Sequence, residues 1–319
     1  IKFYFYSHLI KNSMLTQQEK QVSIILLNYQ RTGKSEIQTL GNVEVYQHRF
    51  KDVKLLKKLV DLGSYTPDEL KLFADACSLA NPGILQLFSQ RKLNPNAHEL
   101  FLEDVACTLA EEIEMRKKTS TPFRDVEVLA IATSVLNALS AFQENCLPHR
   151  QITPFSILKT AQGEYKIMHP LALGSRLPTY NKILNEGLVR LYRYIPPEAK
   201  YHVAKGTETP ASDPFKEDVY SLGITLIEAC ALDASDSDYK VKLKEVKNIY
   251  SFPLVNLLEK MIDNNHLIRP PPSAVLEWIR VHNLQEKITG WLTIRSSDFS
   301  ESPVNISSLE RTIIYFSSC

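Results

Sequence analysis

The stretch CLPHRQITPFSIL, residues 146–158, decides how this 319-residue chain is interpreted. It contains a histidine–arginine pair, His149 and Arg150, which can make several hydrogen bonds at the base of a loop. The three polar residues that follow, Gln151, Thr153 and Ser156, carry only uncharged amide and hydroxyl groups. The stretch is therefore a loop rich in hydrogen-bonding groups, and its function depends on the elements that flank it.

Those flanking elements have clear periodicity. A long helix is predicted from Thr121 and Pro122 onward, with one apolar face made by Leu129, Ala132, Leu136 and Leu139. FSILKTAQGEYKIM, residues 155–168, predicts a hairpin turning at Gln162 and Gly163. VYSLGITLIEACAL, residues 219–232, is apolar nearly all round, which predicts a fully buried helix. PLVNLLEKMI and PSAVLEWIRVH predict two later amphipathic helices.

The first hundred residues are richer in strand signals. QVSIILLNYQ (21–30) and NVEVYQHRF (42–50) are predicted as strands joined by a loop, RTGKSEIQTLG (31–41). KDVKLLKKLVDLG (51–63) has helical spacing. The next helix has a full start signal, because Thr66 is an N-cap, Pro67 fits the first helical position and Glu69 completes a capping box. ILQLFSQRKL and HELFLED then predict two further strands around an Asn-Pro-Asn turn.

A strand-rich front followed by a mostly helical back predicts an α+β fold with two lobes. Four motifs occur in the back half in a fixed order: the His149-Arg150-Gln151 loop, YRYIPPEAK (192–200), KEDVYSLGITLIEA (216–229) and NNHLIRPPPSAVLEWI (264–279). They resemble the catalytic loop, the end of the activation segment, the central helix and the late arginine segment of protein kinases. The resemblance covers residues 20–285 and implies a two-lobed protein kinase-like fold, with a small antiparallel β lobe and a larger helical lobe.

The resemblance divides the chain into four parts. Residues 1–19 are an N-terminal extension, 20–104 a degenerate kinase N-lobe, 105–286 a kinase-like C-lobe and 287–319 a C-terminal tail. The tail is serine-rich and has no clear periodicity, so it has no structural assignment.

The positions that carry kinase chemistry are changed. The proton-accepting aspartate is replaced by Gln151, the metal-binding asparagine by Ser156, the loop lysine by Thr153 and the metal-binding aspartate by His169. Glutamine cannot accept a proton near neutral pH, and serine or imidazole is a poor ligand for magnesium. In the front lobe, Val43-Glu44-Val45-Tyr46 resembles the strand that carries the phosphate-holding lysine, so that Tyr46 stands in its place. The glycine-rich loop is also missing.

The positions that carry the kinase frame are kept. The resemblance implies that His149, Arg150 and Asp218 hold the loop, and that Glu198 and Arg269 form a buried ion pair. We expect a folded, catalytically inactive pseudokinase with no cofactor, no bound metal and no affinity for metal-ATP. The helical stretch 51–63, the segment between His169 and Glu198 and the tail are candidate binding surfaces.

Composition limits the partners. Lysine plus arginine number 37 and aspartate plus glutamate 36, so no global field attracts nucleic acid or an anionic membrane. The five cysteines lie far apart without metal spacing, which suits free thiols in a reducing compartment. The expected partners are other proteins in a multi-protein assembly, and the expected location is the cytoplasm, with the cytoskeleton as a candidate association.

Two classes of function remain open from the sequence. The first is a scaffold, an allosteric partner or a structural subunit, which needs no open cleft. The second is an unconventional nucleotide-binding protein or a residual protein Ser/Thr kinase-like enzyme, which needs a cleft with convergent polar groups.

Overall fold

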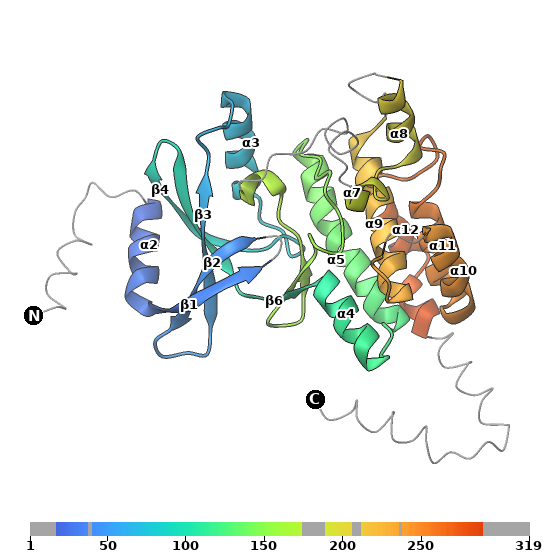
Figure 1. Cartoon of the computed structure of the whole chain (residues 1–319), viewed down its shortest axis with the longest axis horizontal. Helices are drawn as coiled ribbons and strands as arrows, with labels where there is room; N and C mark the ends of the chain where they lie inside the picture. Colours follow the sequence, from blue (N-terminus) through green and yellow to red (C-terminus); the bar gives the residue numbers. More distant parts are fainter. Residues whose placement is uncertain (1–16, 38–39, 174–188, 206–211, 236–237, 290–319) are drawn as a thin grey trace, which may run out of the picture.

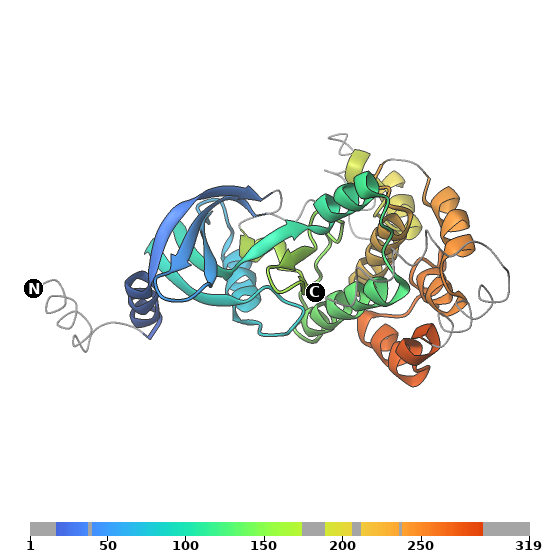
Figure 2. The same ribbon diagram turned by 90° about the horizontal axis from the view of Figure 1, so that it is seen from below.

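The computed structural model describes residues 17–37, 40–173, 189–205, 212–235 and 238–289. The described chain is α+β, with a strand-rich half followed by a helical half (Figures 1 and 2). A five-stranded antiparallel sheet forms the first half, and a small three-stranded sheet lies between it and the helices.

The large sheet has the strand order β1-β2-β3-β5-β4. Its strands are β1 (Tyr29–Ile37), β2 (Gly41–His48), β3 (Lys54–Asp61), β4 (Leu87–Asn94) and β5 (Ala97–Glu103). Both faces of the sheet are covered. On the outer face, helix α2 (Gln17–Asn28) packs through Val22 onto Tyr46, Leu55 and Phe101. On the inner face lie Val43, Leu56, Val60, Leu100 and Leu102, which belong to the main core.

A row of alternating charges crosses all five strands on the outer face. Arg31 pairs with Glu44 at 3.0 Å and Glu44 with Lys57 at 2.7 Å. Lys57 also pairs with Glu99 at 3.0 Å, and Glu99 pairs with Arg91. Cross-strand pairs of opposite charge each stabilise a sheet by roughly 0.2–1 kcal/mol. Helix α2 therefore covers one part of the outer face, and this row of ion pairs covers the part beside it.

Helix α3 (Pro67–Ser78) joins the two halves. The predicted capping box is confirmed: the Glu69 amide donates to the Thr66 hydroxyl at 3.2 Å, and the Thr66 amide donates to the Glu69 carboxylate at 2.7 Å. Helix α3 turns Phe73 inward and contacts the short 3-10 helix η1 (Pro170–Leu173). The Tyr65 hydroxyl donates to the Leu171 carbonyl at 3.3 Å, so the residues around α3 are tied to the helical half.

The helical half is built on α5 (Asp125–Glu144) and α9 (Pro214–Ala231). The predicted apolar face of α5 is buried, and α9 is buried without a break from Glu217 to Cys230. Helix α5 is long and apolar enough to cross a membrane, but 61% of its most apolar window is buried inside the fold, as in a core helix. The other helices are α4 (Leu109–Thr119), α7 (Val189–Tyr192), α8 (Pro197–Ala204), α10 (Tyr239–Ile249), α11 (Phe252–Met261) and α12 (Pro272–Val281).

The predicted hairpin is present as β7 (Leu158–Thr160) and β8 (Tyr165–Lys166), with β6 (Val105–Thr108) beside β7. Gly163 adopts φ +84°, the left-handed conformation that favours glycine in such a turn. Isolated pairing of Ile84 with Ile167 connects this small sheet to the segment before β4.

Three predictions for the front half are wrong. Residues 21–28 belong to α2, because Val22, Ile25 and Tyr29 recur at helical spacing and meet one apolar cluster. The predicted loop 31–41 is mostly strand β1. The predicted helix 51–63 contains strand β3, paired with β2 and β5. Because both faces of this sheet are covered, apolar residues occupy successive positions and the alternation typical of a strand is lost.

Candidate functional site

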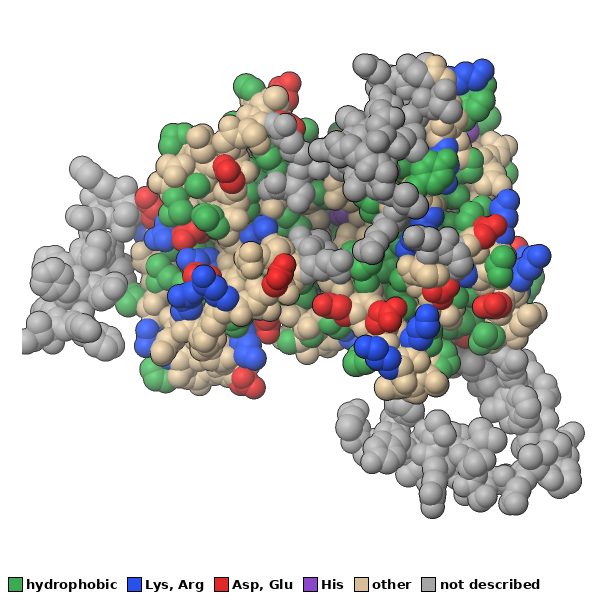
Figure 3. Space-filling view, in the orientation of Figure 1, with side chains coloured by type: hydrophobic (Ala, Val, Ile, Leu, Met, Phe, Trp, Pro, Cys, Tyr) green, Lys and Arg blue, Asp and Glu red, His purple; other side chains and the backbone are tan. Residues whose placement is uncertain are grey.

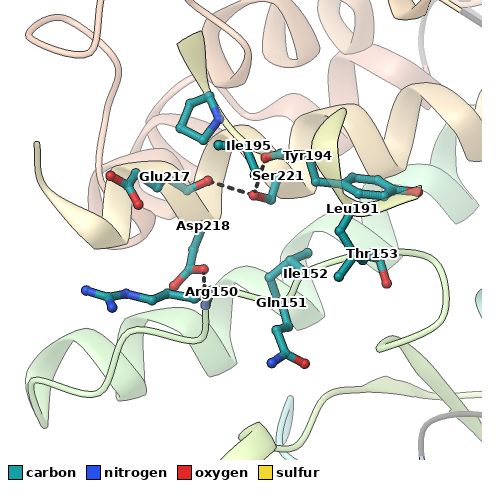
Figure 4. Close-up of a pocket in the computed structure, with 11 residues that line it drawn as sticks. Arg150, Gln151, Ile152, Thr153, Leu191, Tyr194, Ile195, Glu217, Asp218 and Ser221 are labelled. Atoms are coloured by element: carbon teal, nitrogen blue, oxygen red, sulfur yellow. Dashed lines mark hydrogen bonds between the residues drawn. The ribbon is translucent and has the colours of Figure 1, made fainter. Parts of the chain in front are cut away.

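The loop of residues 149–156 follows α5 and precedes β7, between the two halves of the fold. Asp218, at the start of α9 and fully buried, holds the first turn of this loop (Figure 4). Its carboxylate accepts hydrogen bonds from the His149 amide at 2.7 Å and the Arg150 amide at 2.6 Å. Arg150 has φ +58°, a conformation that is strained for a residue with a side chain. The carboxylate therefore fixes a backbone turn that costs free energy by itself.

Two histidines hold this loop against residues 168–171, the segment that leads into the short helix η1. His149 Nε2 lies 3.2 Å from the Met168 carbonyl, and His169 Nε2 lies 3.1 Å from the Pro148 carbonyl. Each ring thus binds the carbonyl of the residue that precedes the other histidine. The Nδ1 atoms accept hydrogen bonds from the amides of Gln151 and Leu171, both at 3.3 Å. An accepting Nδ1 requires the proton on Nε2, so both imidazoles are neutral in this arrangement.

The two rings lie 5.9 Å apart and both contact Phe142 of α5. Burial, with a further contribution from the neighbouring His169, lowers the pKa of His149 to about 3. Burial lowers the pKa of His169 to about 4. We call these two side chains the histidine brace.

The histidine brace predicts acid sensitivity. A folded-state pKa below the unfolded value gives stability that is present above pH 6.5 and is lost as the pH falls toward 4. For His169 alone the loss is about 3 kcal/mol. Burial raises the pKa of Asp218 to about 7, which has the opposite sign and favours the folded state as the pH falls. Urea unfolding of the wild type and of His169→Gln between pH 7 and 4.5 should give the steeper decline for the wild type. Equal slopes would contradict the prediction.

Of the three polar residues of the loop, Ser156 and Thr153 are hydrogen-bonded to each other, and the Gln151 side chain points away from Asp218 (Figure 4). The Ser156 hydroxyl accepts from the Thr153 amide at 2.9 Å and donates to the Thr153 carbonyl at 3.0 Å. Thr153 is buried, whereas the Gln151 amide points away from Asp218 (Figure 4). Among the described residues, no group of three or more histidine, cysteine, aspartate or glutamate side chains could hold a metal ion.

A cavity beside the loop is lined by residues of the loop, of α9 and of the segment 191–196 (Figure 4). Its volume is about 20 Å³, which is the space of roughly one water molecule. Ser221 in its wall donates to backbone carbonyls, with the Tyr194 oxygen at 2.9 Å and the Glu217 oxygen at 3.0 Å. The cavity is a gap in the packing and is too small for a substrate.

The predicted ion pair between Glu198 and Arg269 is confirmed. Arg269 has no solvent exposure and donates to both carboxylate oxygens, at 2.6 and 3.1 Å. It also donates to the Asp263 carbonyl at 2.9 and 2.7 Å and lies 4.9 Å from the centre of the Tyr220 ring. These contacts join α8, α9 and the segment before α12 at one point.

Tyr46 does not lie near the loop. It is on β2, faces outward and packs edge-on against Phe101 with ring centres 6.4 Å apart. Glu44 also faces outward, in the row of charges. The strand that directly precedes α3 is β3, and its inward-facing cation is Lys58. The Lys58 amine donates to the Leu40 carbonyl beneath the β1–β2 turn, and burial lowers its pKa.

Sequence reasoning missed Lys58, although one signal was available. The capping box at Thr66 fixes the start of α3, so the strand immediately before it is the stretch that contains Leu56 and Lys58. Lys58 lies two positions after Leu56 and therefore faces the same, inner side. Because this stretch was predicted as a helix, the strand before it, which contains Tyr46, was matched to the lysine-bearing strand of protein kinases.

Comparison of the sequence with models of known protein families and with curated protein sequences found no match in either case.

Proposed function

We propose that this chain is a catalytically inactive, protein kinase-like domain that works by binding other proteins. The observation that carries the proposal is the use of the loop itself. At two of the positions that would take part in phosphoryl transfer, Ser156 and His169, the side chains instead make hydrogen bonds that hold the backbone.

The order of helices and strands supports the proposal of a kinase-like fold. Three strands precede helix α3, and strands β4, β5 and β6 and helix α4 follow it. The long helix α5, the loop, a hairpin and later the buried helix α9, with Asp218 near its start, come next in the chain. Asp218 on the loop amides, and Glu198 on Arg269, are the contacts that the resemblance implies for a kinase frame. Helix α3 against η1 also suits this arrangement.

The proposal that the domain is catalytically inactive rests on the missing anionic side chains at the loop. Phosphoryl transfer needs a proton acceptor and oxygen ligands for magnesium close to the transferred group. Gln151 offers an amide, the Ser156 hydroxyl is bound to Thr153, and His169 is buried with both ring nitrogens in hydrogen bonds. Asp218 is a carboxylate, but both of its oxygens accept backbone amides.

Lys58 favours a second candidate function. A half-buried amine on the inner face, with a backbone carbonyl as its partner, can attract an anion such as a nucleotide phosphate. Lys58, and not Tyr46, therefore occupies the inward-facing position on the strand before α3. Nucleotide binding without metal, through Lys58, is the alternative to a purely protein-binding role.

Thermal unfolding in the presence of ATP separates the two candidates. A ligand of the native state raises the midpoint by mass action. We expect no magnesium-dependent rise at millimolar ATP for the wild type, because Gln151, Ser156 and His169 supply no anionic oxygen ligand for the metal. A magnesium-dependent rise would refute the inactive assignment. A rise without magnesium that Lys58→Met abolishes would support the nucleotide-binding alternative.

The candidate binding surfaces change in the light of the fold. Residues 51–63 contribute β3 to the middle of the sheet, so this stretch is no longer a candidate. Residues 174–188 and 290–319, which include most of the other two candidates, lie outside the described residues. We retain the proposal of protein partners in a multi-protein assembly in the cytoplasm, and look for the surface elsewhere.

A further inference from the structure

A groove crosses the waist of the molecule, where the large sheet meets the hairpin of β7 and β8. It is lined by the turn before β3, the start of β4, the end of β5 and the β7–β8 turn, and its volume is about 350 Å³. We call it the waist groove; its lining residues are Asp52, Val53, Lys54, Gln86, Phe88, Glu103, Asp104, Ala161, Gln162 and Glu164.

The waist groove carries an excess of negative charge. Glu103 and Glu164 share a single cation, Lys166, which lies 2.9 Å from an oxygen of each. Among the described residues, no lysine or arginine forms an ion pair with Asp52 or Asp104, and Lys54 acts on Asp104 only through its longer-range field. The groove and its immediate surroundings therefore hold four carboxylates against two amines. The carboxylates are those of Asp52, Glu103, Asp104 and Glu164, and the amines are those of Lys54 and Lys166.

Asp104 in particular lacks compensation. Burial is the largest influence on its carboxyl and raises the pKa, while Lys54 and the Val105 amide oppose this effect more weakly. A half-buried carboxylate in this condition gains free energy when a cation approaches it. The groove thus has an electrostatic preference for a positively charged occupant.

The walls of the groove also expose apolar side chains. Phe88 is 40% exposed and Val53 is 45% exposed. Phe50, in the turn just before Val53, is 86% exposed, which is unusual for a phenylalanine. Phe88 is the extra residue of a bulge in β4, the strand at the edge of the sheet. Because it has no partner residue on β5, its ring is not placed by the regular pairing of the two strands.

We propose that the waist groove is the docking site for an arginine-containing segment of a partner protein. The inference rests on the proposed protein-binding function and names the chemistry of the partner. A guanidinium group can pair with carboxylates at Asp52 and Asp104 and stack on the ring of Phe88. An apolar residue beside the arginine covers Val53.

The same charges exclude other classes of partner. Nucleic acid and anionic lipid surfaces carry negative charge and are repelled by an acidic groove. Over the face drawn in Figure 3, side chains of both signs are interspersed, with no broad basic area.

A second groove, along α4, provides an internal control. It is lined by Ala110, Glu111, Glu114, Met115, Lys118, Thr119, Phe155 and Ala234, with a volume of about 600 Å³. Nothing in the structure shows what covers it. Its Glu114 and the exposed Glu245 of α10 supply two carboxylates that do not line the waist groove and can be neutralised as a control.

The test uses the full chain and a fluorescent seven-residue peptide in which arginine alternates with leucine and phenylalanine. Fluorescence anisotropy at low salt is expected to give a Kd of tens of micromolar. Asp52→Asn with Asp104→Asn should weaken binding about tenfold, since it removes both unpaired carboxylates. Phe88→Ala should weaken it about fivefold. The matched control, Glu114→Gln with Glu245→Gln, removes the same charge and should change the Kd less than about twofold.

Four outcomes would overturn the inference, the fourth by showing a different ligand. The peptide fails to bind up to millimolar concentration, the control weakens binding as much as the groove variant, or a peptide with citrulline in place of arginine binds equally well. Competition by spermine with no effect of Phe88→Ala would show a site for small polycations instead. Any of these removes the groove proposal alone, because the inactive, protein-binding assignment is judged separately by ATP titration and by native co-purification of partners.

Discussion

Replacing Arg269 by leucine is expected to lower the free energy of unfolding by about 3–5 kcal/mol, or to prevent folding of the helical half. The substitution leaves the Glu198 carboxylate without its bidentate partner and the Asp263 carbonyl without two donors. It also removes the cation above the Tyr220 ring. The loss follows from an unpaired charge at a buried position, and not from the strength of the ion pair itself.

Urea unfolding, followed by circular dichroism, measures the effect. The matched control is the pair Glu277 and Arg280 on α12, which has the same chemistry but is exposed. Arg280→Leu should leave the unfolding midpoint close to that of the wild type, because solvent screens exposed pairs. If Arg269→Leu unfolds no earlier than Arg280→Leu, the buried pair does not stabilise the helical half.

Introducing three residues that protein kinases use in catalysis is expected to destabilise the chain without producing phosphate transfer. The triple variant is Gln151→Asp, Ser156→Asn and His169→Asp. At position 169 the buried imidazole donates to the Pro148 carbonyl, and a carboxylate there places two acceptors against each other. Asparagine at 156 disrupts the serine contacts with Thr153. The expected loss is about 2–5 kcal/mol, the range for burying an uncompensated polar group or charge.

The single variants identify the source of the loss. Gln151→Asp alone should be nearly neutral, because this side chain is partly exposed and points away from Asp218, whereas His169→Asp alone should account for most of the loss. Phosphate transfer from radiolabelled ATP to a generic acceptor should stay at background for the triple variant. Measurable transfer, with a stable fold, would mean that only these three residues separate the chain from catalysis.

The sequence predicts the helical half well, for physical reasons. Helix α9 is apolar on all sides because every side of it is covered, and α5 has one long apolar face that contacts it. The pairing of Glu198 with Arg269 was expected from the resemblance to protein kinases, and the contact is present in the structure. Capping signals at Thr66 located the start of α3 to the residue.

The sheet half was predicted less well. Its strands are covered on both faces, so β3 lacks the alternation that separates a strand from a helix. That error placed Tyr46 at a functional position and concealed Lys58. The contacts of His169 were also beyond the sequence, because they depend on a carbonyl 21 residues earlier in the chain.

The histidine brace also sets how this part of the molecule can open. Because each imidazole binds the carbonyl just before the other, neither the segment at 148–151 nor the segment at 168–171 can leave its place alone. The two therefore form one cooperative unit of local unfolding, with a single opening equilibrium for both. Through Tyr65 and Leu171 that unit also includes the approach to α3. A partner that holds one of the two segments in place therefore holds the other in place as well.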